Sequence, residues 1–280
     1  MKTKKIAVIT MARNDEFFLN RWVRYYGAQF GEENLYIYLD GLDQEIPVFA
    51  EKTNITILPR TEGKVVAADR GRMKIINQEA KKILQNYDLI IGTDADEFLV
   101  VEPNCGKSLA EYLSSIKIKN TVSGLGIDVA QKLDEEPELD KELPFLAQRS
   151  YAFVSTRYTK TSVKTKPINW GAGFHRLMGN NFTIDKNLYL FHFGSVDAKI
   201  IENKISDKDK IKTGWTRHLK KRMRVINYVS TKKARDFDKS LPLARKIQTI
   251  FRPIYAWNKP AMLGMRWIIK LPERFRDIGI

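Results

Sequence analysis

Tyr87-Asp88-Leu89-Ile90-Ile91-Gly92-Thr93-Asp94-Ala95-Asp96-Glu97-Phe98-Leu99 is the stretch that decides the fold, because an apolar run ends there in three carboxylates within four residues. Such a run predicts a buried parallel strand, and open α/β sheets bind their ligands outside the carboxyl ends of such strands. Alternate residues of an extended chain project the same way, so we expect Asp94 and Asp96 to aim their carboxylates at one point. Oxygen donors suit Mg²⁺ or Mn²⁺. The stretch therefore predicts a metal site, with phosphate bound through the metal.

The surrounding sequence predicts an α/β protein with a mostly parallel sheet flanked by helices, because expected strands alternate with expected helices. The expected strands are residues 5–11, 35–39, 53–58 and the run before Asp94, and the expected helices are residues 15–30 and 67–86. Beyond Pro103 the pattern changes. There we expect a short helix over 108–118, a strand over 121–130 and an acidic surface loop over 133–143.

Two motifs together resemble a known group of enzymes. Asp94-Ala95-Asp96-Glu97-Phe98 resembles the Asp-x-Asp region of glycosyltransferases of the family 2-like and family 92-like groups, which use the GT-A nucleotide-sugar fold. The opening, residues 6–16 and then 18–26, is similar to their first strand, turn and following helix. This resemblance covers roughly the first two thirds of the chain. It implies a GT-A catalytic domain over 1–198, with a nucleotide-sugar-binding half (1–103) and an acceptor-binding half (104–198).

The resemblance also implies which residues contact the donor and a divalent cation. Asp96 is expected to be the direct metal ligand, and Asp94 to reach the metal through water or to hold the ribose. The structural alternative is that these acids only cap the next segment. The residues expected to surround the nucleotide are Ala12, Arg13, Asn14, Glu16, Asp40, Arg70, Arg72 and Asp94. For Arg70 and Arg72, ordinary surface charge is the equal alternative.

Two residues beyond Pro103 are candidates for the remaining chemistry. His192, in a His-aromatic pair similar to that of the related families, is expected to be a further metal ligand, although its apolar neighbours are equally typical of a buried core histidine. Asp128, at the end of the expected strand 121–130, is the candidate base that takes the proton of the acceptor hydroxyl. Asp134 and Glu135 are rival candidates for the base.

The net charge of +15 is concentrated at one end of the chain. Residues 199–280 contain 22 basic and 7 acidic residues, whereas residues 1–198 contain 26 of each. Aromatic side chains are interspersed among these cations, which favours an anionic membrane surface as partner. The alternative is a helical appendage that packs its aromatics on the catalytic domain. No nucleic-acid-binding motif accompanies the charge, so we expect no nucleic-acid partner.

The remaining features favour a cytoplasmic protein on the inner face of the cell membrane. The single cysteine, Cys105, rules out an intramolecular disulfide framework and fits a reducing compartment. The apolar stretch near the N-terminus is too short for a signal peptide, and no run reaches the ~18–20 apolar residues that a membrane span needs.

The sequence therefore predicts a metal-dependent, inverting glycosyltransferase. It would move a sugar from a nucleotide-sugar donor, expected to be a UDP-sugar, to a glycan or lipid-linked acceptor in surface-polysaccharide biosynthesis. One alternative is a non-catalytic, membrane-bound scaffold of the same fold. Another is a nucleotidyltransferase, which would normally have a glycine-rich loop after the first strand, where this chain has Thr10-Met11-Ala12-Arg13-Asn14.

Overall fold

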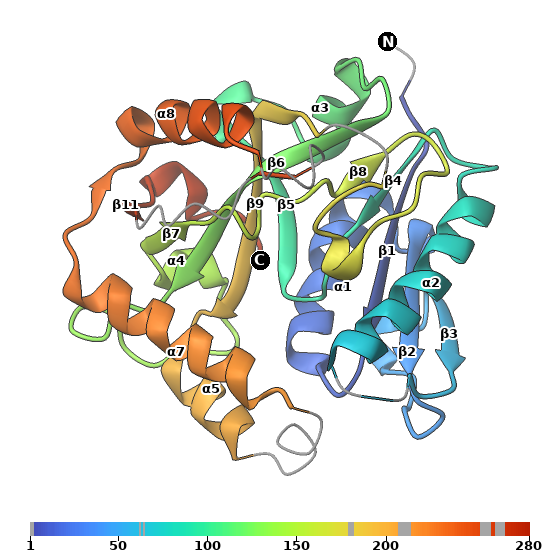
Figure 1. Cartoon of the computed structure of the whole chain (residues 1–280), viewed down its shortest axis with the longest axis horizontal. Helices are drawn as coiled ribbons and strands as arrows, with labels where there is room; N and C mark the ends of the chain where they lie inside the picture. The colour runs from blue at the N-terminus through green and yellow to red at the C-terminus, as the bar shows by residue number, and fades with distance from the viewer. Residues whose placement is uncertain are drawn as a thin grey trace.

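The computed structural model describes residues 3–61, 63, 65–178, 182–206, 214–252, 259–260 and 267–280. Its centre is a sheet flanked by helices (Figure 1). The first half is a parallel sheet in the order β3-β2-β1-β4. Its elements are β1 (Ile6–Ala12), α1 (Glu16–Phe30), β2 (Leu35–Asp40), β3 (Asn54–Leu58), α2 (Val65–Ile83) and β4 (Leu89–Gly92).

Helices α1 and α2 cover opposite faces of this parallel sheet. Ile6 and Val8 of β1 pack in one apolar cluster with α1, whereas the alternate residues Ala7 and Ile9 pack in a second cluster with α2. Both faces of β1 are therefore buried, which explains its continuous apolar sequence.

The second half of the chain continues the sheet with mixed pairing. β8 pairs antiparallel with both β4 and β6, and β6 runs parallel to β9. β5, β7 and β11 add antiparallel pairs, and β10 runs parallel to β11. The strands are β5 (Glu97–Val101), β6 (Thr121–Ala130), β7 (Tyr151–Val154), β8 (Val163–Lys164), β9 (Ile184–Ser195), β10 (Arg235–Asp236) and β11 (Ile268–Lys270).

The helices of the second half are α3 (Leu109–Ser115), α4 (Phe145–Gln148), α5 (Ala198–Ile205), α7 (Thr216–Thr231) and α8 (Phe237–Ile250). α7 and α5 pack their apolar residues against β6 and β7. Buried residues of α8, among them Phe237 and Leu241, join the main core together with Phe275. The basic C-terminal region thus contributes to the core and to the sheet. The aromatic residues Tyr255 and Trp257 lie outside the described residues.

The α/β class with a mainly parallel sheet flanked by helices is confirmed, and the expected elements are found within a few residues of their predicted ends. Two details differ. The β2–β3 connection contains only one turn of 3-10 helix, Val48–Ala50, and the antiparallel pairs of the second half were not expected. Within the described residues, no helix is long and apolar enough to cross a membrane.

Candidate active site

The predicted Asp-x-Asp motif forms a tight turn at the carboxyl end of β4. The amide of Glu97 donates to the carbonyl of Asp94 at 3.0 Å, so the four residues do not continue as an extended strand. The expectation that strand alternation would aim both carboxylates at one point is therefore wrong. The residue before the turn, Gly92, has no room for a side chain, because a Cβ there would meet the rings of Trp170 and Phe174 at 2.7–2.9 Å.

Asp94 lies between two cations. Its Oδ1 accepts from Arg72 of α2, and its Oδ2 lies 3.0 Å from Nζ of Lys160, which also approaches Oε1 of Glu97 at 2.5 Å. Burial opposes ionisation of Asp94, but Lys160 and Arg72 outweigh it and hold the pKa of this carboxyl well below its usual range. Burial raises the pKa of Glu97 to about 7, against the opposing charge of Lys160. Asp94 is therefore an ionised acid with its charge balanced by the protein.

Asp96 faces a different set of partners. Its Oδ2 accepts from Nη2 of Arg222 at 2.8 Å and lies 3.4 Å from Nε2 of His192. Nδ1 of the same histidine is 2.7 Å from Oδ1 of Asp128, and the ring of Tyr158 stacks on the imidazole at 3.7 Å. Burial lowers the pKa of His192, but the two carboxylates outweigh it and raise it to about 9. The structure thus joins Asp96, His192 and Asp128 through one imidazolium.

Gly194 permits the approach of Arg222 from α7. A Cβ at this position would lie 2.5 Å from Cζ of Arg222 and 2.5 Å from Cε1 of His192. A side chain here would therefore push the guanidinium and the imidazole apart, so the glycine is required by the packing of α7 on β9.

A polar pocket of about 210 Å³ lies beside this cluster, at the carboxyl ends of β1 and β2. It brings together four of the predicted nucleotide contacts, Ala12, Arg13, Asn14 and Glu16. Asn14 adopts a positive φ of 46°, which turns the chain between β1 and α1. Other residues that line the pocket are Asp15, Leu19, Leu39, Asp43, Gln44, Glu45 and Pro47.

Arg13 and the remaining predicted nucleotide contacts already have partners within the described part of the chain, except for Arg70. Arg13 donates to the carbonyl of Asp40 at 2.7 Å and forms a paired contact with Asp43. The Asp40 carboxylate accepts from the amide and hydroxyl of Thr61, so one of its oxygens holds a loop. Arg72 lies on Asp94, whereas Arg70 is exposed.

Lys204 of α5 links the pocket to the carboxylate cluster. Its Nζ lies 2.9 Å from Oδ1 of Asp15, a residue of the pocket wall, and its charge helps to lower the pKa of Asp96. Sequence reasoning missed Lys204, Lys160 and Arg222. Lys160 follows a threonine and precedes another, and Arg222 stands in a run of cations, so neither has a local signal that marks it.

Mn²⁺ or Mg²⁺ requires several oxygen donors that are free to bind it. Asp94 and Asp96 offer suitable oxygens, but these oxygens face Arg72, Lys160 and Arg222. Among the described residues, no group of three or more His, Cys, Asp or Glu side chains is arranged to hold a metal. Both ring nitrogens of His192 face carboxylates. A metal ion at Asp96 would therefore have to displace Arg222.

No protein-family model matches the chain, and no curated protein matches its sequence. Solved structures align only partly. A glycosyltransferase involved in the glycosylation of the major capsid of PBCV-1 aligns at 16% identity and a TM-score of 0.25, over 43% of this chain and 50% of that one. The bifunctional glycosyltransferase WbbM in its apo form aligns at 10% identity and a TM-score of 0.25, over 48% of this chain and 24% of that one.

A CMP:2-keto-3-deoxy-manno-octonic acid synthetase complexed with CTP aligns at 10% identity and a TM-score of 0.29, over 79% of this chain and 87% of that one. The chain thus spans half or less of the two glycosyltransferases. Similarities at these TM-scores assign no function, which has to be argued from the site.

Proposed function

We propose that this protein is a GT-A-type glycosyltransferase that moves a sugar from a nucleotide-sugar donor, expected to be a UDP-sugar, to a glycan or lipid-linked acceptor. The observation that carries the proposal is the placement of the Asp94–Asp96 turn. It lies at the carboxyl end of β4, beside the polar pocket that four predicted nucleotide contacts line. Surface-polysaccharide biosynthesis is the predicted pathway, from the resemblance of the motifs alone.

The site supplies charge for the leaving group. As the C1–O bond of the donor breaks, its electron pair and negative charge pass to the nucleoside diphosphate. Arg72, Lys160 and Arg222 are the cations that surround the turn, and guanidinium groups suit phosphate oxygens. Mn²⁺ or Mg²⁺ is proposed from the resemblance of the motifs alone; it would neutralise the charge that develops on the diphosphate, and Asp96 would hold it only after Arg222 is displaced.

Asp128 is the proposed base for an inverting transfer. The acceptor oxygen bonds to C1 while its proton passes to the Asp128 carboxylate. Oδ1 of Asp128 is held by Nδ1 of His192 at 2.7 Å, which leaves the second oxygen for the proton. Tyr158 fixes the plane of the imidazole by stacking on it, so the carboxylate is held in one orientation.

A donor assay tests the proposal. The purified protein is incubated with UDP-, GDP- and CMP-sugars, with Mn²⁺, Mg²⁺ or a chelator, and release of the free nucleotide is measured. We expect release from one donor class and its loss in the Asp128→Asn variant. Binding without turnover of any donor would favour the scaffold. Pyrophosphate release from a nucleoside triphosphate and a sugar phosphate would instead identify a nucleotidyltransferase.

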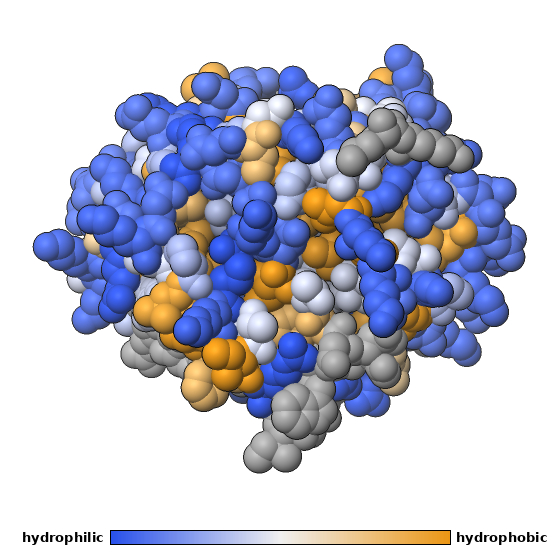
Figure 2. Space-filling view, turned by 90° about the horizontal axis from the view of Figure 1, so that it is seen from above, coloured by the Kyte–Doolittle hydropathy of each residue, from blue (hydrophilic) through white to orange (hydrophobic). Residues whose placement is uncertain are grey.

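We also propose that the C-terminal region holds the protein on an anionic membrane. Three apolar side chains of α8 and its end, Leu243, Ile250 and Phe251, are more than half exposed. Lys246 is exposed on the same helix. Figure 2 views the molecule from the side where α8 lies in Figure 1 and shows apolar patches among hydrophilic side chains. Apolar and cationic groups together are typical of interfacial helices.

A further inference from the structure

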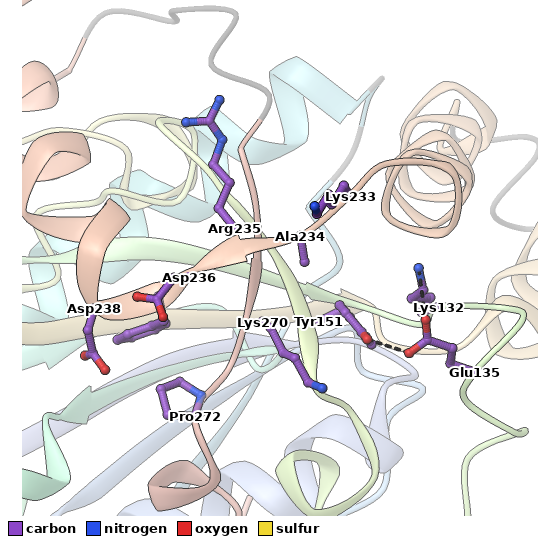
Figure 3. Close-up of a pocket in the computed structure, with 11 residues that line it drawn as sticks. Lys132, Glu135, Tyr151, Lys233, Ala234, Arg235, Asp236, Asp238, Lys270 and Pro272 are labelled. Atoms are coloured by element: carbon purple, nitrogen blue, oxygen red, sulfur yellow. Dashed lines mark hydrogen bonds and ion pairs between the residues drawn. The ribbon is translucent and has the colours of Figure 1, made fainter.

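A second and larger cavity, of about 560 Å³, lies away from the Asp94–Asp96 turn. Figure 3 shows its walls, which come from the loop after β6, the start of β7, the segment from β10 into α8, and the end of β11. Of the residues considered for sugar transfer, only Glu135, a rival candidate for the base, lines it. Its volume is in the range of sites that bind small molecules.

The acidic side chains of this cavity already have partners. Glu135 accepts from the Tyr151 hydroxyl at 2.5 Å and lies 3.2 Å from Nζ of Lys132. Asp236 caps α8 by accepting from the amide of Lys239, and Asp238 pairs with Arg274. Glu135 and Asp238 are thus paired with cations, whereas Asp236 is held by a backbone amide.

Three cationic side chains of the cavity differ in this respect. Lys233, Arg235 and Lys270 are exposed, and within the described part of the chain none of them forms an ion pair. The Arg235 guanidinium lies over the ring of Trp267 at 4.7 Å, which leaves the two lysines. Nζ of Lys270 lies 5.9 Å from the centre of the Tyr151 ring, and Lys132 lies 5.1 Å from the same ring. The cavity therefore combines two lysines that have no ion-pair partner among the described residues with the Tyr151 ring in its wall.

We propose that this cavity is a second binding site, for a saccharide that carries a phosphate or carboxylate group. Lysine ammonium groups bind such anions as point charges, and the Tyr151 ring offers an apolar surface to the sugar. The choice of a saccharide rests on the proposed transferase function, whereas the binding of an anion rests on the cavity alone. Lys132, Glu135 and Tyr151 belong to the predicted acceptor-binding half, so the site would hold a part of the acceptor remote from the transferred sugar.

Binding measurements test this site without turnover. The probes are glucose 6-phosphate, glucuronate and glucose, measured by calorimetry or ligand-observed NMR on the full chain. The test variant is Lys233→Gln/Lys270→Gln, and the matched control is Lys239→Gln/Lys246→Gln, which removes the same charge from α8 outside the cavity. We expect one or both anionic sugars to bind more tightly than glucose, and the test variant alone to lose about tenfold in affinity.

The outcomes separate the two proposals. Affinity that is kept in the inactive Asp128→Asn variant and is not displaced by UDP supports the second site even if no donor is turned over. Displacement by UDP would overturn it, because the probe would then occupy the donor site. If inorganic phosphate binds as tightly as the two anionic sugars, the site recognises only the anion, and the choice of a saccharide as ligand is overturned. If neither sugar binds, but the protein binds anionic vesicles and loses this binding in Lys233→Gln/Lys270→Gln, the cavity contacts a membrane and the proposal is overturned.

Discussion

Asp94 and Asp96 are separated by one residue, yet they bind opposite parts of the molecule. Asp94 binds Arg72 of α2 and Lys160, whereas Asp96 binds His192 of β9 and Arg222 of α7. The first set belongs to residues 1–198 alone, while the second brings in the basic C-terminal region. The turn therefore joins the C-terminal helices to the candidate active site. One of the cations concentrated at the C-terminal end of the sequence, Arg222, lies in that site.

Each acid is also linked through a cation to a second carboxylate. His192 links Asp96 to Asp128, and Lys160 links Asp94 to Glu97. The proposed chemistry distinguishes them. Asp128→Asn keeps the shape of the base but removes its ability to accept the proton, so transfer should fall by about 10²- to 10⁴-fold. Donor affinity, measured by calorimetry, should be unchanged.

Glu97→Gln is the matched change on the other side. Glu97 is paired with Lys160 at 2.5 Å and is not proposed to accept a proton, so this variant should keep most of the transfer rate. Equal losses in the two variants would contradict the assignment of the base. Weakened donor binding in Asp128→Asn would place Asp128 in the nucleotide pocket instead.

Stability should separate the two acids of the turn. Asp96→Asn leaves His192 and Arg222 without their shared carboxylate, and removing one partner of a buried charge pair costs about 3–5 kcal/mol. Each variant leaves one arginine without its carboxylate, while His192 retains Asp128 and Lys160 retains Glu97. The Asp94 and Arg72 side chains are 25% and 22% exposed, against 11% and 19% for Asp96 and Arg222, so a smaller loss is expected for Asp94→Asn. Urea unfolding of both variants measures the difference. A larger loss for Asp94→Asn would show that the contacts of Asp94 with Arg72 and Lys160 contribute more to the free energy of unfolding than those of Asp96.

The dependence of stability on pH should sharpen the view of the Asp96 side. The pKa of His192 is raised to about 9 in the folded protein, so its contribution is complete below the unfolded value of 6.5 and is lost as pH rises through about 9. The shift corresponds to about 3 kcal/mol. Burial lowers the pKa of Lys164 to about 7, which changes stability in the opposite direction over the same pH range.

The comparison of wild type with His192→Gln removes this opposing effect. The difference in the free energy of unfolding should be largest at and below pH 6.5 and should fall by about 3 kcal/mol toward pH 10. A difference that stays constant over this range would contradict a charged His192.

Much of this arrangement was predictable from the sequence, because the strands that carry it have strong local patterns. The run before Asp94 and the segment 121–130 both form the expected strands, and they place Asp94, Asp96 and Asp128 in one region. The partners of the turn were not predictable. Arg222 is 126 residues from Asp96 and Lys160 is 66 residues from Asp94, and such contacts depend on tertiary packing.

Of Asp94 and Asp96, only Asp96 is paired with a described cation of the C-terminal region, so a metal ion at Asp96 should compete with Arg222, with a smaller expected effect. Arg222→Gln frees Oδ2 of Asp96 from its charged partner, so Mn²⁺ should bind about tenfold more tightly. Arg224→Gln, an exposed position on the same helix, is the control and should leave the affinity unchanged. Calorimetric titration with Mn²⁺ measures both. An unchanged affinity in Arg222→Gln would place any metal away from Asp96.

The smallest expected effect concerns the outer surface of the C-terminal region. Truncation near residue 240 is unsuitable, because Leu241, Ala244 and Phe275 are buried in the main core. The variant Leu243→Ser/Ile250→Ser/Phe251→Ser instead removes exposed apolar groups of α8 and its end. Its control, Leu42→Ser/Val48→Ser, changes the exposed apolar groups of the first half, where the net charge is balanced.

In flotation with anionic vesicles, the wild type and the control should bind, and the α8 variant should bind more weakly. Each Lys or Arg near the surface contributes about 1 kcal/mol and is screened by salt, whereas the apolar contribution is not. Raising the salt concentration should therefore weaken the wild type without abolishing its binding, and should release the α8 variant. Equal flotation of all three proteins would contradict a membrane role for α8. The absence of wild-type flotation would leave the C-terminal region its roles within the fold, among them completing the core and placing Arg222 on Asp96.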